Sequence, residues 1–340
     1  MARSKIEWCD FTANPWVGCQ KVGPGCDHCY AETRDKRFHG GVHWGPGAPR
    51  HRTVPATRNA PLKWNREAQA FREEHGHWPR VFSGSLCDLF DNAVDPIWRR
   101  DHWAVIRETK NLRWMLLTKR IGNVLAMLPE GWLDGGFDHV GIMITVVNQV
   151  EANRDVPRLL DLPMSGNQWR GVSNEPALGP VDYTRIVSSN RYGFGGIYDA
   201  LRGVWRPGDD EGAAVRDPRA SVLDWIVWGG ESGDDARPPH PAWARAVRDQ
   251  CAEAGTAFLM KQWGEWAPHQ PKAGGNLGGD VRRGLVRLVH PSGRSDEEIF
   301  VASAGRSTEP GSCYMGRVGK ARAGRELDGR VHHEFPRQLQ

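Results

Sequence analysis

Three cysteines stand close together near the start of the sequence, in the segment NPWVGCQKVGPGCDHCY. Cys19, Cys26 and Cys29 have the spacing C-x6-C-x2-C, and residues 23–25 (Gly-Pro-Gly) can form a tight turn around a metal centre. Three thiolates leave one position of a tetrahedral or cubane site open, and an iron without a protein ligand can bind a substrate or cofactor directly. The spacing therefore predicts an iron–sulfur cluster that performs the chemistry of the protein.

A structural zinc ion is the alternative for the same cysteines. His28 lies inside the C-x2-C pair and is awkwardly placed as a fourth ligand, whereas Cys9 is better placed. The remaining thiols, Cys87, Cys251 and Cys313, stand alone in the sequence, and we expect them to be small buried or partly buried residues. We expect no disulfide framework, because we place the protein in a reducing compartment.

Length and composition indicate an ordinary globular protein. The 340 residues are 39% hydrophobic and 25% charged, and no stretch approaches the roughly 18 apolar residues that a membrane span needs. The start, MARSKIEWCD, lacks the apolar core of a secretory signal, so we expect a cytoplasmic protein with no membrane partner. The net charge of +4 is compatible with a nucleic-acid partner but does not demonstrate one.

Short apolar, β-branched runs alternate with helix-like stretches along the chain. The runs lie at 80–86, 113–119, 139–147, 168–173, 224–230 and 256–263, and helical patterns lie at 95–110, 149–161 and 241–254. Runs that are almost continuously apolar suit strands buried on both faces, as in parallel sheets. The alternation predicts an α/β fold with a full or partial parallel (β/α) barrel, and a doubly wound open sheet is the alternative.

Two regions interrupt this rhythm. Residues 189–222 are rich in glycine and charge and resemble an insertion, and residues 266–340 contain glycine-rich loops and a basic end. We therefore expect a barrel over residues 1–265, with the cysteine loop at 19–29. Residues 266–340 would form a C-terminal extension that packs on the barrel.

Polar residues follow every predicted strand. In parallel α/β folds the carboxyl ends of the strands carry the active site, because the following loops converge there. We therefore expect the residues at these strand ends, most of them polar, to surround one site. They are Ser83, Ser85, Asp88, Thr118, Lys119, Thr145, Asn148, Gln149, Ser173, Asn174, Glu175, Gly229, Gly230, Glu231, Ser232, Lys261 and Gln262.

A three-cysteine loop on a parallel barrel resembles the radical S-adenosylmethionine superfamily, in which the usual spacing is C-x3-C-x2-C. Tyr30, directly after the last cysteine, is typical of that superfamily, where an aromatic residue lies beside the bound nucleoside. The whole chain resembles a more specific group, the phage-associated three-cysteine-motif family of unknown function. Its matching segments run in order from residue 4 to 336 and are SKIEWCDFTANPWVGCQKVGPGCDHCYAE, SLCDLF, LLTKR, SNEPALGPVDY, WIVWGGESG, FLMKQWGEW and GKARAGRELDGRVHHEFP. The chain departs from this family at Cys9, where Thr is usual, and at Val147, where Glu is frequent.

This resemblance implies a radical S-adenosylmethionine enzyme. Cys19, Cys26 and Cys29 would hold three irons of a [4Fe–4S] cluster, and the fourth iron would bind the amino and carboxylate groups of S-adenosylmethionine. One-electron reduction by an external donor would cleave the cofactor and give a 5′-deoxyadenosyl radical, which would abstract hydrogen from the substrate. The tasks of the protein would be to position the cofactor, tune the cluster and exclude water.

The same hypothesis assigns cofactor contacts to the strand-end residues. We expect Ser83, Ser85 and Asp88 near the amino group of the cofactor, and Thr145 and Asn148 near its ribose.

The other strand ends would serve catalysis and the substrate. We expect Glu175 to contact the cofactor or the substrate, and Glu231 to be catalytic. Residues 229–230 (Gly-Gly) would allow a ligand to approach the backbone closely. The expected substrate contacts are Lys261, Gln262 and Trp263.

The basic residues of the C-terminal segment bear on the substrate. With Trp263 and Trp266 nearby they would suit a nucleic-acid backbone and an extruded base, although a solvated basic surface explains the same pattern. They are Arg317, Lys320, Arg322, Arg325, Arg330 and Arg337. We therefore expect DNA or other nucleic-acid modification or repair. The alternatives are the same chemistry on a small molecule or peptide, and a zinc-stabilised nucleic-acid-binding protein without catalysis.

Overall fold

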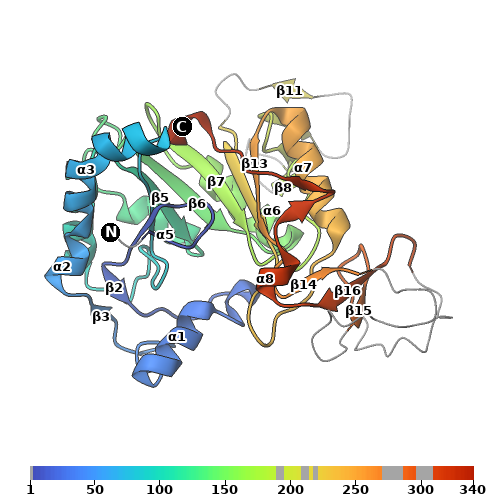
Figure 1. Ribbon diagram of the computed structural model, residues 1–340. Helices are drawn as coiled ribbons and strands as arrows, with labels where there is room; N and C mark the ends of the chain where they lie inside the picture. The colour runs from blue at the N-terminus through green and yellow to red at the C-terminus, as the bar shows by residue number, and fades with distance from the viewer. Residues whose placement is uncertain (1–2, 189–194, 208–213, 217–220, 270–285, 296–308) are drawn as a thin grey trace.

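The central element of the protein is a seven-stranded parallel sheet that curves into a half-barrel (Figure 1). The computed structural model describes residues 3–188, 195–207, 214–216, 221–269, 286–295 and 309–340. The strands lie side by side in the order in which the chain forms them, which confirms the predicted α/β fold and partial parallel barrel. They are β1 (Phe11–Ala13), β4 (Arg80–Ser83), β5 (Arg113–Thr118), β6 (Val140–Thr145), β7 (Trp169–Asn174), β12 (Trp225–Gly229) and β13 (Ala257–Gln262).

The six strands that coincide with the predicted apolar runs bury residues on both of their faces. Along β5, Trp114 and Leu116 belong to the core beneath the helices, whereas Met115 belongs to a second core inside the half-barrel. In β6, Ile142 and Met143 divide between the two cores in the same way. Successive side chains of a strand point to opposite faces, so both cores draw on β4, β5, β6, β7, β12 and β13, whereas β1 contributes only to the core beneath the helices.

Helices connect the strands and cover the outer face of the sheet (Figure 1). Three of them begin at side-chain caps. The side chains of Asp95, Asn148 and His240 accept hydrogen bonds from the backbone amides of Ile97, Glu151 and Ala242. The helices are α1 (Tyr30–His39), α2 (Pro55–Arg58), α3 (Ala60–His75), α4 (Pro96–Glu108), α5 (Ile121–Met127), α6 (Gln149–Leu160), α7 (Pro241–Ala254) and α8 (Lys320–Ala323). In the part of the chain that the structure describes, no helix combines the length and apolar character needed to span a membrane.

The inside of the half-barrel is filled from both ends of the chain. Trp8 packs on Phe82 with ring centroids 4.7 Å apart, and Leu339 is buried in the same inner core. The guanidinium of Arg80, at the start of β4, donates a hydrogen bond of 3.0 Å to the carbonyl of Leu339. Its carbon also lies 3.6 Å from the ring centre of Phe335. The contacts of Arg80 thus close the half-barrel at the end where its strands begin.

The edge of the sheet at β13 is covered by the C-terminal segment. The amide of Met260 donates to the carbonyl of His332 at 3.0 Å, and the amide of Glu334 donates to the carbonyl of Phe258 at 3.1 Å. The segment runs antiparallel to β13. Its pairing satisfies backbone groups that a bare edge strand would leave open to other chains.

Four small antiparallel sheets surround the half-barrel. One includes the described part of the predicted insertion at 189–222, and the sheet of β14, β15 and β16 belongs to the predicted extension. Within these two regions, residues 189–194, 208–213, 217–220, 270–285 and 296–308 lie outside the described residues. The strands are β8 (Ile186–Ser188), β9 (Gly196–Asp199), β10 (Val204–Pro207) and β11 (Val215–Arg216); β14 (Trp266–Pro268), β15 (Val286–Val289) and β16 (Cys313–Arg317); β17 (Glu326–Leu327) and β18 (Arg330–Val331); and β2 (Trp16–Val17) and β3 (His51–Arg52).

The inner core leaves no room for a side chain at Gly141 of β6. A Cβ there would lie 1.9 Å from the ring of Trp169, so we expect Gly141→Ala to lower the free energy of unfolding by about 1–3 kcal/mol. Gly122 of α5 is the control, because its nearest neighbour would be an Arg158 nitrogen at 3.9 Å. Gly122→Ala should raise the free energy of unfolding by up to about 1 kcal/mol, since alanine favours a helix. Denaturant titration measures both, and an undiminished stability of Gly141→Ala would contradict this packing.

Candidate functional site

A cavity of about 430 Å³ lies at the carboxyl ends of the strands, and Cys19, Cys26 and Cys29 all line it. Loops that follow β4, β5, β6, β7, β12 and β13 complete its wall. The structure thus brings the cysteine loop and most of the predicted strand-end residues to one site. The predicted residues that line it are Tyr30, Ser85, Asp88, Thr118, Lys119, Thr145, Ser173, Glu175, Gly230, Glu231, Ser232, Lys261 and Gln262.

Other predicted site residues lie outside the cavity wall and contact the protein itself. The hydroxyl of Ser83 lies 2.8 Å from Nε2 of the buried His102, and Asn148 caps α6. The indole N–H of Trp263 donates to the carbonyl of Glu326 at 2.8 Å. Each of the three side chains therefore has a structural partner.

The glycine pair after β12 makes a close approach within the chain. A Cβ at Gly230 would lie 2.0 Å from the carbonyl oxygen of Trp263, and one at Gly229 would lie 3.1 Å from Cδ of Glu175. Gly230 lines the cavity, whereas Gly229 packs behind Glu175. The absence of side chains here is explained by packing, and it does not require a ligand.

The cysteine loop follows β2 and packs against the connection between β6 and α6 and the start of α6. Its turn, η1 (Pro24–Cys26), follows Gly23 and contains Gly25, and neither position has space for a side chain. A Cβ at Gly23 would lie 2.7 Å from a Glu151 oxygen, and one at Gly25 would lie 2.8 Å from Val147. The Gly-Pro-Gly sequence therefore fixes the loop against the sheet.

The three thiols differ in exposure: Cys26 is buried, and Cys19 and Cys29 are partly exposed. Burial raises the pKa of the Cys19 thiol to about 11, although the neighbouring Arg120 charge opposes the shift. Among the described residues, no three His, Cys, Asp or Glu side chains form a group that could hold one metal ion. The cysteines therefore share a cavity without converging on a single point.

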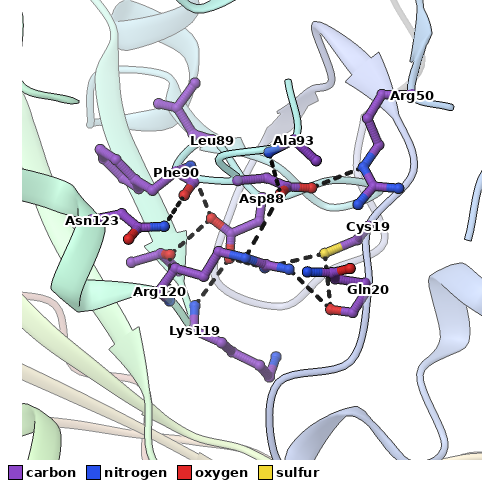
Figure 2. Close-up of polar contacts among 12 residues, drawn as sticks. Cys19, Gln20, Arg50, Asp88, Leu89, Phe90, Ala93, Lys119, Arg120 and Asn123 are labelled. Carbon is purple, nitrogen blue, oxygen red and sulfur yellow. Dashed lines mark hydrogen bonds and ion pairs between the residues drawn. The ribbon is translucent and has the colours of Figure 1, made fainter. Parts of the chain in front are cut away.

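Asp88 lies at the centre of a hydrogen-bond network next to the cysteines (Figure 2). One carboxylate oxygen accepts from the Thr118 hydroxyl at 2.8 Å and from the Phe90 amide at 2.9 Å. The other accepts from the Lys119 amide and from the Arg120 guanidinium, both at 3.1 Å. The carboxylate thus joins the loop after β4 to the end of β5.

Arg120 extends this network to the cysteine loop (Figure 2). Its Nη1 donates to Sγ of Cys19 at 3.3 Å, and its Nη2 donates to the carbonyl of Gln20 at 3.0 Å. Burial alone would lower the pKa of Arg120, but the charges of Asp88 and Cys19 raise it well above its usual value. Arg120 was absent from the predicted site, although it follows Thr118 and Lys119 in the segment LLTKR and its position after a strand could have revealed it.

A second buried ion pair holds the loop after β4 from the other side. Arg50 donates to a carboxylate oxygen of Asp91 at 2.8 Å, and both side chains are almost fully buried. Arg99 of α4 donates to the carbonyls of Leu89 and Asp91 at 2.8 and 2.7 Å. No local pattern around Arg50 or Arg99 signals this role, because their partners lie 8 to 41 residues away.

Glu231 and Arg237 link the loop after β12 to the cysteine loop. Arg237 donates to both oxygens of Glu231, at 2.6 and 2.8 Å, and also reaches Asp27 at 3.0 Å and the Pro24 carbonyl at 2.9 Å. Burial would raise the pKa of Glu231, but the hydrogen bonds from Arg237 outweigh it and lower the pKa. His28 lies beside the same carboxylate, with Nδ1 3.1 Å from its oxygen.

A third charged group connects the ends of β7 and β13. The ammonium of Lys261 donates to both oxygens of Glu175, at 2.7 and 2.9 Å, and the Gln262 amide nitrogen donates to Glu175 at 3.0 Å. By contrast, Oε1 of Gln262 and Oγ1 of Thr145 are buried without a hydrogen-bond partner. Both residues line the cavity, so they are the polar groups that a ligand would most readily satisfy.

Tyr30 is tied to the loop after β4 from the start of α1. Its hydroxyl donates to the carbonyl of Ser85 at 2.5 Å, and the hydroxyl of Ser85 accepts from Asn14 at 2.8 Å. Tyr30 and Ser85 both line the cavity, as the sequence predicts for the site.

Two of the cysteines outside the triad lie near the site. Cys87 is buried as expected, yet it also lines the cavity, and burial raises the pKa of its thiol well above the usual range. Its pKa also responds to the charge of Cys19. Cys9 is buried in the inner core, and burial raises its pKa to about 12. Both thiols are therefore kept protonated.

Most of the predicted basic segment binds the protein rather than facing the cavity. Arg317 donates to the carbonyl of Gly233 at 3.0 Å, and Arg325 lies 2.7 Å from the ring nitrogen of His333. Lys320, at the start of α8, is the member of this segment that lines the cavity.

The buried Asp88–Arg120 pair should matter far more for stability than an exposed pair. Asp88→Asn should lower the free energy of unfolding by about 3 kcal/mol, because it leaves the buried Arg120 charge without its partner. Asp328→Asn is the control, since Asp328 pairs with Arg245 and Arg248 at the surface and should cost under about 1 kcal/mol. Urea titration compares the two variants, and equal losses would show that Asp88 does not hold the loop.

Comparison with known proteins finds one family of unknown function over nearly the same residues as the resemblance seen in the sequence. No curated protein and no solved structure matches the chain. The sequence profile of the family described as "Protein of unknown function (DUF5131)" matches residues 3–336. The chain therefore belongs to this family of unknown function over nearly its whole length.

Proposed function

We propose that the protein is a radical S-adenosylmethionine enzyme that acts on nucleic acid. The observation that carries this proposal is the shared position of Cys19, Cys26 and Cys29, which line one cavity at the carboxyl ends of parallel strands. In parallel α/β enzymes this end of the sheet is the site of chemistry. The sequence resemblance supplies the class of chemistry, and an external donor would provide the electron.

The donor set fits a cluster better than a single zinc ion. Thiolates that share one zinc must converge within tetrahedral distance of it, whereas each thiolate of a cluster binds a different iron. Among the described side chains no triad that could hold one ion is present, although the three thiols line one cavity. Three thiols that line one cavity fit a cluster in which each would bind a different iron.

The side chains around the cavity would bind and orient the cofactor. A bound cluster would supply one-electron reduction of S-adenosylmethionine, and with it radical hydrogen abstraction from the substrate. Thr145 and Gln262 each offer a buried oxygen without a partner, which suits hydroxyl or amino groups of a ligand. Tyr30 and Ser85 lie at the same wall, where the resemblance places the nucleoside and the amino group.

The apolar part of the wall would exclude water from this chemistry. Ile6, Trp8, Phe82 and Leu117 line the cavity and belong to, or pack against, the inner core. A water-poor wall strengthens polar contacts to a bound ligand and protects reactive species from the solvent.

The charged pairs would hold the cysteine loop in position. Arg120 donates to Cys19 and Gln20, and Arg237 reaches Asp27 and Pro24. We therefore propose a positioning role for Glu231, which was expected to be catalytic. Arg237 keeps Glu231 anionic and occupies both of its oxygens, so it is poorly suited to donate a proton.

Anaerobic reconstitution with iron and sulfide tests the class of enzyme. We expect about four irons per chain and an EPR spectrum that changes on addition of S-adenosylmethionine, because one iron lacks a protein ligand. Dithionite reduction should then yield 5′-deoxyadenosine. Cys26→Ala should abolish cluster and product, and Cys251→Ala is the control because that thiol belongs to α7 and is buried in the core beneath the helices, outside the cavity wall. Stoichiometric zinc without a cluster or cofactor cleavage would refute the proposal.

Arg120 should set the reduction potential of the cluster. Hydrogen bonds to ligand sulfurs stabilise the more negative, reduced state, so losing one lowers the potential. Arg120→Lys keeps the charge next to Asp88 but loses the forked contact to Cys19 and Gln20, and we expect a lower potential in an EPR-monitored redox titration. Arg154→Lys on α6, whose partner is Asp155, is the control and should leave the potential unchanged. Identical potentials in all three proteins would mean that the Arg120 contact does not reach the cluster.

A further inference from the structure

The cavity has an excess of positive charge that resident carboxylates do not neutralise. Every acidic side chain in its wall already has a basic partner: Asp88 pairs with Arg120, Glu175 with Lys261, and Glu231 with Arg237. In the described part of the chain, the side chains of Lys119 and Lys320 line the cavity without a hydrogen bond or ion pair. We infer that these two lysines bind a phosphate ester of the substrate.

Lys119 reaches the cavity from the end of β5, beside the cysteine loop. Its backbone amide binds Asp88, while its side chain extends away from that carboxylate (Figure 2). The Cε atom lies 3.5 Å from the position that a Cβ would take at Gly25. Burial raises the pKa of Glu151, and the charge of Lys119 partly opposes this shift. Among the described contacts, however, Lys119 and Glu151 form no ion pair, and Glu151 lies 3.7 Å from Arg154 instead. The ammonium is therefore available to a ligand next to the cysteines.

Lys320 approaches the same cavity from the C-terminal extension. The segment that carries it is anchored on the loop after β13, where the amides of Val318 and Gly319 both donate to the carbonyl of Glu265 at 3.0 Å. The amide of Trp263 donates in turn to the carbonyl of Gly324 at 3.1 Å. These bonds hold the start of α8 at the rim, so Lys320 is exposed there and can meet a substrate as it enters.

Two cations at one cavity repel each other, and an anion between them removes that cost. Lysine acts as a point charge and is a common phosphate binder. The inference depends on the proposed function for the identity of the substrate as nucleic acid, and it adds which part of that substrate the cavity recognises. The carboxylate of S-adenosylmethionine is a second anion that the two lysines could bind. The experiment below distinguishes it from a substrate phosphate.

The test measures binding of a short, fluorescein-labelled single-stranded DNA to full-length protein, as purified and after cluster reconstitution. Lys119→Gln should weaken binding about tenfold, and Lys320→Gln a few-fold, because hydrogen bonds to charged groups lose strength with exposure. An oligonucleotide of the same sequence with uncharged methylphosphonate linkages should bind weakly and respond to neither variant. Lys63→Gln on α3, a lysine outside the cavity wall, is the control and should bind like the wild type.

Three results from DNA binding alone would overturn the inference. They are an absence of DNA binding by the wild type, equal binding by the wild type and both cavity variants, and equal binding of the charged and uncharged DNA. A loss of S-adenosylmethionine affinity in Lys119→Gln with unchanged DNA binding would also overturn it, by assigning the charge to the cofactor carboxylate. Iron content and EPR spectra of the same variants keep the two proposals apart. If no cluster forms but DNA binding still depends on the two lysines, only the radical chemistry is refuted. If the cluster forms but DNA binding does not depend on the lysines, only the phosphate site is refuted.

Discussion

The buried ion pair between Asp88 and Arg120 joins three parts of the chain that lie far apart in sequence. Asp88 comes from the loop after β4, Arg120 from the residues directly after β5, and the thiol of Cys19 from the loop after β2. A carboxylate that accepts four hydrogen bonds and a guanidinium that donates to both neighbours have few alternative arrangements. Burying such charges is tolerated only when their geometry is good and their remaining polar atoms are satisfied. The position of the cysteine loop therefore depends on this pair as well as on the close packing of its glycines.

The charged and polar side chains of the cavity wall are of two kinds, those held in ion pairs and those without a partner. Three carboxylates are held in ion pairs by arginine or lysine at the strand ends. Among the described residues, Oγ1 of Thr145, Oε1 of Gln262 and the ammonium groups of Lys119 and Lys320 have no hydrogen-bond or ion-pair partner. A rigid set of paired charges around a few unpaired groups is the pattern expected when a site is preorganised for a ligand.

The sequence predicts the sheet well because its strands are long apolar runs buried on both faces. Six of the seven strands coincide with those runs, whereas β1 escapes notice because Phe11–Ala13 is too short to show a pattern. Convergence of the polar strand ends follows from parallel topology alone. The partners of Arg50, Arg99 and Arg237 cannot be predicted in this way, because a side-chain contact between distant segments leaves no local pattern in the sequence. Ser83 and Trp263 show the reverse case, in which a polar or aromatic residue beside a strand end binds the protein instead of the cavity.

The C-terminal segment that closes the half-barrel has a consequence for biosynthesis. Arg80 meets Leu339 across 259 residues, and β13 receives its last hydrogen bonds from residues 332–334. Because the chain is made from its amino end, the interior of the half-barrel stays open until these residues leave the ribosome. Contacts of such long sequence separation form late and slowly, and an exposed strand edge is prone to pair with other chains in the meantime. The nascent protein is therefore expected to expose this strand edge until residues 332–339 have been synthesised.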